Sequence, residues 1–168
     1  MREVSIEFTR PSSWFKPLSW AIRLIEGTPY SHVRLRFKKQ NGIEMVYEAS
    51  GTSVKFIGEL SLQELKIDIL HSYSIGLTNE QFSKMIDICV IHANLDYGKL
   101  QLLGILLVRI FGLKKNPLSR GRKSQVCSEI VGKFLQEILD IGHDLNLDIA
   151  GPKAIQDVLE RHPSIWRK

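Results

Sequence analysis

The chain has 168 residues, of which 43% are hydrophobic and 24% are charged. This composition is ordinary for a globular protein and excludes a disordered or fibrous chain, and the length suits one domain over residues 1–168. The net charge of +5 permits an anionic partner without requiring one. The two cysteines, Cys89 and Cys127, are too few for a disulfide scaffold.

The first ten residues, MREVSIEFTR, bear on both location and structure. They include Glu3 and Glu7 and lack the apolar run of a signal peptide, so we expect a cytoplasmic protein, or one exported by another route. Val4, Ile6 and Phe8 alternate with polar residues, which predicts a first strand.

The next segment, RPSSWFKPLSWAIRLIEG, predicts a short helix. Ser12 or Ser13 would cap its start, and Gly27 would end it. Its apolar residues recur at helical spacing: Trp14, Leu18, Ala21, Ile22 and Ile25.

Four strands are predicted after this helix. TPYSHVRLRFKK alternates, and the turn signal Asn41–Gly42 pairs it with the returning strand IEMVYEAS. TSVKFI and ELKIDILHSYSI predict two more strands, and we expect the four to form an antiparallel meander. One face of the first of these strands would be apolar (Val33, Leu35 and Phe37) and the other polar (His32, Arg34, Arg36 and Lys38).

The second half predicts helices. TNEQFSKMIDICVIHANL would be capped at Thr78 or Asn79, and its apolar face makes Cys89 a core residue; that face comprises Phe82, Met85, Ile86, Cys89 and Val90. YGKLQLLGILLVRIFGL is apolar nearly all round, but it is too short for a transmembrane helix and Arg109 interrupts it. A buried central helix is the simpler interpretation, and a helix facing lipid or a partner subunit is the alternative.

A basic loop, KKNPLSRGRKS, precedes a helix whose apolar stripe is Ile130, Val131, Phe134, Leu135 and Ile138. A final helix would begin at Pro152 and end before Pro163. The predicted fold class is therefore α+β, a small antiparallel sheet packed with helices.

Cys127 occupies the predicted start of a helix, with Ser124 as a candidate N-cap. Free backbone N–H groups there favour the thiolate form of a cysteine and can receive an oxyanion. Such a thiolate needs a partner for its proton, usually a histidine. No Cys/His spacing indicates zinc, and neither a metal nor an organic cofactor is implied.

His32 is the candidate partner, because the hairpin brings the Ser31–His32 end of one strand close to Tyr47–Glu48 of the next. A carboxylate at Glu48 would hold the imidazole in one tautomer and orientation. Taken alone, a histidine at a strand start such as His32 is more often a surface residue than a base, and Glu48 could equally be an exposed strand residue. The other four histidines are most simply surface or capping residues, or residues without an evident role.

Four segments in order, YSHVRLRF, VYEASGTSVKF, LDYGKL and VCSEIVGKFL, resemble the motifs of circularly permuted papain-like hydrolases. These form a branch of the NlpC-type superfamily that includes the YiiX-like proteins and the lecithin:retinol acyltransferase-like enzymes. The resemblance spans roughly residues 30 to 160 and implies a permuted papain-like architecture. It assigns Cys127 as nucleophile, His32 as base and Glu48 as the orienting residue, with Tyr97 and Ser128 on the substrate or oxyanion side.

The resemblance implies a cysteine hydrolase or acyltransferase that cleaves an amide or ester bond, in a cell-wall peptide or an acyl or lipid-like group. An anionic substrate would suit the basic loop. The alternative is a non-catalytic module that binds an acyl chain or peptide in the same pocket. We expect no specific nucleic-acid binding, because no aromatic residues interleave with the cations Arg34 and Arg36. Membrane contact and the oligomeric state stay open.

Overall fold

The computed structural model describes residues 1–168 except 13–15, 40, 59–60, 62–65, 120–123 and 168. Three sequence-based predictions lie outside the described residues. These are the cap at Ser13, the packing of Trp14, and the placement of the loop cations Arg120, Arg122 and Lys123.

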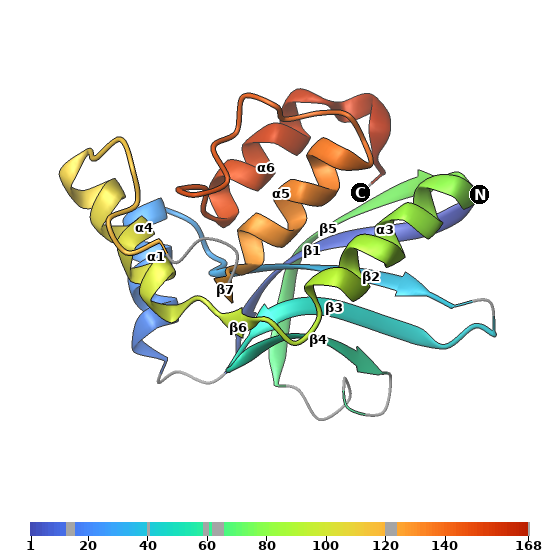
Figure 1. Cartoon of the computed structure of the whole chain (residues 1–168), viewed down its shortest axis with the longest axis horizontal. Coiled ribbons are helices and arrows are strands. Elements are labelled where there is room, and N and C mark those ends of the chain that lie inside the picture. The colour runs from blue at the N-terminus through green and yellow to red at the C-terminus, as the bar shows by residue number, and fades with distance from the viewer. Residues whose placement is uncertain (13–15, 40, 59–60, 62–65, 120–123, 168) are drawn as a thin grey trace.

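A sheet of seven strands, counted within the described residues, forms the centre of the fold (Figure 1). Its spatial order is β5-β1-β2-β3-β4-β6-β7, and neighbouring strands are antiparallel except for the parallel pair β6–β7. The strands are β1 (Arg2–Pro11), β2 (His32–Lys38), β3 (Glu44–Ser50), β4 (Ser53–Gly58), β5 (Ile67–Leu77), β6 (Asp96–Tyr97) and β7 (Ser124–Gln125).

The helices are α1 (Pro17–Glu26), α3 (Asn79–His92), α4 (Lys99–Phe111), α5 (Cys127–Glu137) and α6 (Pro152–Arg161), followed by the 3-10 turn η2 (Pro163–Ile165). Helices α3, α5 and α6 lie over one face of the sheet, whereas α1 and α4 lie together near the end that holds β6 and β7 (Figure 1). The α+β prediction is confirmed.

The predicted meander is right for β2, β3 and β4 and wrong for β5. Strand β5 pairs with β1, with Arg2 opposite Leu77 and Pro11 opposite Ile67. Alternation in a sequence shows which residues share a face but not which strand is the partner. The return of β5 places β1 between two strands, inside the sheet.

The core lies between the sheet and the helices above it. The predicted apolar faces of β1, β2 and α5 are buried together there, and so is Cys89; the main contributors are Val4, Ile6, Phe8, Val33, Leu35, Phe37, Ile130, Val131, Phe134 and Leu135. Each fully buried side chain of this size stabilises the fold by about 1.5–3 kcal/mol. Val90 is an error in the predicted α3 face, because it is 59% exposed.

Helix ends account for several further differences. Thr78 caps α3 through a reciprocal capping box, as predicted. Helix α1 begins at Pro17 rather than after Ser12, and α5 begins at Cys127 with Val126 as its N-cap, so Ser124 is not the cap. The carboxylate of Glu26 accepts a hydrogen bond from the first turn of α6, an interaction that the sequence does not reveal.

Helix α4 is not a buried central helix. One side, with Leu102, Ile105 and Leu106, packs in a second small core, while Ile110 and Phe111 are exposed. No helix in the described part of the chain combines the length and apolar character needed to cross a membrane.

A row of ion pairs crosses β1, β2 and β3 on the polar side of these strands. Glu7, 4% exposed, accepts a hydrogen bond from Arg34 Nε at 2.8 Å and one from Arg36 Nε at 2.6 Å. Arg36 also bonds Glu44, and Arg34 Nη1 lies 3.7 Å from Glu48 Oε2. Buried charges of this kind persist because each has a partner of opposite sign.

We expect Glu7→Gln to lower the free energy of unfolding by about 3 kcal/mol, because it leaves the buried Arg34 without a full charge partner. Urea denaturation measures the change. Glu3→Gln, an exposed position on the same strand, is the control and should change stability by less than about 0.5 kcal/mol. Equal effects of the two substitutions would contradict the assigned role of the ion-pair row.

Candidate active site

The two short strands β6 and β7 fix the start of helix α5. Tyr97 pairs in parallel with Gln125, and Gly98 N–H donates to Gln125 O at 3.0 Å. Val126 then adopts an extended conformation and the helix begins at Cys127. The first N–H groups of a helix have no intrahelical acceptor. The backbone N–H of Cys127 is one of these groups, and it lies beside the thiol of the same residue.

The β2–β3 hairpin places His32 beside Glu48. Leu35 lies opposite Tyr47, so Glu48 and His32 are diagonal neighbours across the strands. His32 Nε2 lies 3.2 Å from Glu48 Oε2. Glu48 is 3% exposed and also accepts a hydrogen bond from the Ser50 hydroxyl, which fixes its second oxygen.

The second neighbour of His32 is Cys127, whose thiol lies close enough to the imidazole to act on its pKa. Because Nε2 is occupied by Glu48, Nδ1 is the ring nitrogen left for the thiol. The structure therefore brings together the three residues that the sequence singled out. Cys127 itself is only 2% exposed.

Electrostatics favour a charged histidine in this arrangement. Burial alone would lower the pKa of His32, but the charge and hydrogen bond of Cys127 and the contact with Glu48 outweigh it and raise the pKa to about 10. Burial would raise the pKa of Glu48, but His32, Ser50 and Arg34 together lower it to about 2. An ionised Glu48 therefore supports an imidazolium at His32 across the neutral range.

Tyr97 lies close to this group. Burial raises the pKa of its hydroxyl, and the charges of Cys127 and Glu48 raise it further, so Tyr97 stays a neutral hydrogen-bond donor. Ser128 differs from its predicted place, because its buried hydroxyl donates to Ala150 O at 2.6 Å. That bond ties α5 to the segment before α6, so the Ser128 hydroxyl is engaged in packing rather than facing a substrate.

A pocket of about 350 Å³ opens at His32, Glu48 and Tyr97, a size that suits a small ligand or one segment of a larger one. Helix α1 forms its other side, and Ser19 Oγ lies 2.6 Å from Ser31 Oγ, which fixes α1 against the start of β2. The pocket is lined here by Lys16, Pro17, Leu18, Ser19 and Ile22 at the start of α1 and within it, and by Leu102 of α4. No local pattern in the sequence indicates this contribution of α1, since it depends on a tertiary contact.

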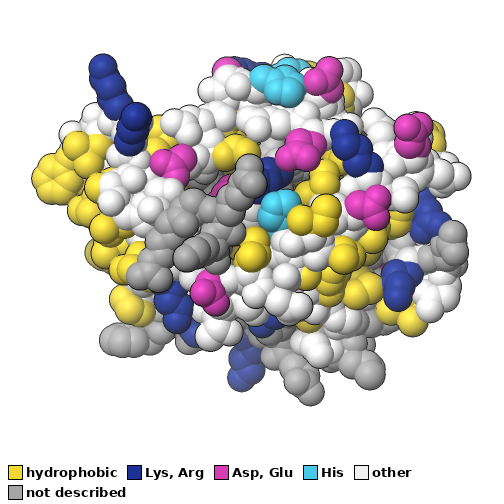
Figure 2. Space-filling view, viewed as in Figure 1, with side chains coloured by type: hydrophobic (Ala, Val, Ile, Leu, Met, Phe, Trp, Pro, Cys, Tyr) yellow, Lys and Arg dark blue, Asp and Glu magenta, His cyan; other side chains and the backbone are white. Residues whose placement is uncertain are grey.

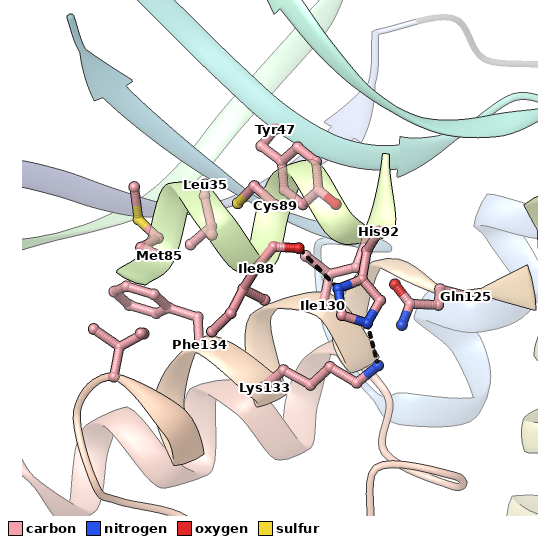
Figure 3. A pocket seen from close by; sticks show the side chains of 11 residues that line it. Leu35, Tyr47, Met85, Ile88, Cys89, His92, Gln125, Ile130, Lys133 and Phe134 are labelled. Carbon is pink, nitrogen blue, oxygen red and sulfur yellow. Dashed lines mark hydrogen bonds between the residues drawn. The ribbon is translucent and has the colours of Figure 1, made fainter. Parts of the chain in front are cut away.

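Cys89 lines a different cavity, between α3 and α5 (Figure 3). Burial raises the pKa of the Cys89 thiol to about 12, so this cysteine is a neutral core residue. At the polar end of the cavity His92 Nδ1 donates to Ile88 O at 2.8 Å, and Nε2 faces Lys133 Nζ at 3.3 Å. The first bond lies within α3 and the second joins α3 to α5, and the neutral Cys89 thiol of this cavity is not activated.

No three His, Cys, Asp or Glu side chains gather into a metal-binding group among the residues described. Known protein families and curated protein sequences were also compared with the chain, and none matches it. The interpretation of the site therefore depends on its geometry.

Site-specific alkylation tests the Cys127–His32 pair. At neutral pH we expect iodoacetamide to modify Cys127 at least about tenfold faster than Cys89, because Cys127 lies beside the charged imidazole of His32 whereas burial raises the pKa of the Cys89 thiol. His32→Ala should slow the reaction of Cys127 and leave that of Cys89 unchanged. Peptide mass spectrometry measures both rates, and equal rates at the two cysteines would contradict the pairing.

The pH dependence of a charged reagent tests the role of Glu48. The ratio of iodoacetate to iodoacetamide rates at Cys127 should fall as the pH rises toward about 10, because His32 loses the positive charge that attracts iodoacetate. Glu48→Gln should move this fall to lower pH, since the carboxylate is one of the groups that raise the pKa of His32. A fall at the same pH in both proteins would show that Glu48 does not act on His32.

Proposed function

We propose that the protein is a thiol hydrolase or acyltransferase acting on an amide or ester carbonyl. The observation that carries this proposal is the position of His32, bonded to Glu48 at 3.2 Å and adjacent to Cys127 at the first position of α5. A nucleophile, a base and an orienting carboxylate in this relation are the parts of a catalytic triad. The resemblance in motif order to the permuted papain-like hydrolases supports the same assignment.

The reaction would proceed in two steps. His32 already carries the proton of the pair, so Cys127 attacks the carbonyl carbon as the thiolate, and the oxyanion accepts hydrogen bonds from the Cys127 N–H and the Tyr97 hydroxyl. The intermediate collapses as His32 returns the proton to the leaving amine or alcohol, which leaves a thioester on Cys127. Water or another acceptor then attacks the thioester, the now neutral His32 takes the acceptor's proton, and the thiolate leaves to restore its pair with the imidazolium.

Two substrate classes suit the pocket, a cell-wall peptide and an acyl or lipid-like group. The apolar side chains of Leu18, Ile22 and Leu102 line one part of it and favour an acyl chain. Lys16 and Arg10 lie at the same pocket and would attract an anionic group such as a stem-peptide carboxylate, although Arg10 already pairs with Asp68 at 3.0 Å.

A second candidate is a module that binds the same ligands without turnover. The observation that favours it is the 2% exposure of Cys127, which leaves little of the thiol open to a carbonyl. In such a module, the His32–Glu48 contact would serve to hold the ligand or the fold.

Ester hydrolysis distinguishes the two candidates. We expect the protein to hydrolyse p-nitrophenyl esters, to form an acyl adduct on Cys127 visible by intact-mass spectrometry, and to lose at least about 1,000-fold of its kcat/KM in Cys127→Ala. Cys89→Ala is the matched control and should keep its activity. Hydrolysis that survives in Cys127→Ala would exclude the thiol mechanism, and ligand binding without an adduct in the unaltered protein would support the binding module.

A further inference from the structure

The solvent side of α4 carries a second apolar row that neither the core nor the candidate site uses. The buried side of the helix packs on Ile22 of α1 through Leu102 and Ile105. The opposite side presents Leu100, Leu103, Ile110 and Phe111, and Leu113 follows the helix; these five residues are 42–69% exposed.

The spacing of this row places it on one face. Leu100, Leu103, the half-buried Leu107, Ile110 and Phe111 follow one another at three- or four-residue steps with one adjacent pair, which keeps them on one side over about 16 Å of helix. A helix needs only one apolar side to join a core, so the fold does not explain the second.

Helix α1 extends the apolar surface. Trp20 and Leu24 lie one turn apart on α1 and are 59% and 65% exposed. Hydrophobic side chains gather along the edge of the molecule where Figure 1 places α4 and α1, shown in yellow at the left of Figure 2. We call this surface the α1–α4 face: Trp20, Leu24, Leu100, Leu103, Leu107, Ile110, Phe111 and Leu113.

The exposed charges on α1, on α4 and in the segment after α4 are of one sign. From Lys99 through Ser128 the sequence contains no acidic residue, and Lys99, Arg109, Lys114 and Lys115 are exposed. The one acidic residue of α1, Glu26, is buried and engaged with the start of α6. The charged side chains that α1 and α4 present to solvent are therefore basic.

We propose that the α1–α4 face docks on the surface of an anionic lipid bilayer. An apolar helix side containing an aromatic residue and bordered by lysine and arginine fits a membrane interface, because the apolar groups enter the acyl boundary while the cations meet anionic headgroups. A second copy of the chain is a poorer occupant, since it would bring two basic borders together.

Docking in this orientation would place the candidate active site close to the bilayer. Leu18 and Ile22 of α1 and Leu102 of α4 line the pocket that holds His32. An acyl group leaving the bilayer would thus have a short apolar path to the site. This consequence rests on the proposed function, whereas the docking surface itself does not.

Vesicle co-sedimentation of the full chain tests the proposal. We expect binding to vesicles of phosphatidylcholine mixed with phosphatidylglycerol, weaker binding to phosphatidylcholine alone, and a loss of affinity at high salt. Leu103→Glu and Phe111→Glu should each weaken binding about tenfold or more while keeping the thermal midpoint, because both side chains are exposed. Ile91→Glu is the matched control: Ile91 is 74% exposed on α3, outside the α1–α4 face, and its replacement should leave binding unchanged.

Three results would overturn the proposal: no binding to the anionic vesicles, equal binding of Phe111→Glu and the unaltered protein, or a dimer in solution that Phe111→Glu dissociates in the absence of any vesicle binding. Two variants distinguish an error in the docking proposal from an error in the proposed thiol chemistry. Cys127→Ala should bind vesicles as the unaltered protein does, and Phe111→Glu should keep the alkylation rate of Cys127 measured without lipid.

Discussion

The contact between His32 and Glu48 is the constraint on which the candidate site depends, and three strands must be in register to support it. A carboxylate that is 3% exposed needs compensating partners, and Glu48 has the imidazole of His32 and the guanidinium of Arg34. Arg34 is itself buried and is held by Glu7 from β1. Glu7 on β1 therefore holds Arg34 of β2 beside Glu48, and the positive charge of Arg34 helps Glu48 to remain ionised next to the histidine.

The thiol reaches this pair through a different part of the chain. Helix α5 is anchored at its start by the β6–β7 pair and near its first turn by the bond from Ser128 to Ala150, and its buried stripe packs on β2 and β3. The same β6 strand carries Tyr97 to the pocket. One short parallel pairing thus sets the positions of both the nucleophile and the neighbouring hydroxyl.

Local patterns in the sequence predict much of this arrangement. Alternation identifies the strands, the Asn41–Gly42 turn sets the β2–β3 hairpin, and that hairpin is sufficient to bring His32 near Glu48. Features that depend on distant partners are not encoded in local patterns. The pairing of β5 with β1, the placement of α1 beside the pocket and the engagement of the Ser128 hydroxyl all involve residues far apart in the chain. Helix α4 shows a further limit, because a sequence that is apolar all round does not reveal which side the core will bury.

Nitrogen NMR of the His32 ring tests the central claim, that His32 is held as an imidazolium between Glu48 and Cys127. The account predicts a protonated ring through neutral pH that titrates near pH 10, and a clear downward shift of that pKa in Cys127→Ala, because Cys127 is the largest of the groups that raise it. A ring that titrates near its ordinary value of about 6.5, or one that is unaffected by Cys127→Ala, would contradict the pairing and with it the proposed thiol chemistry.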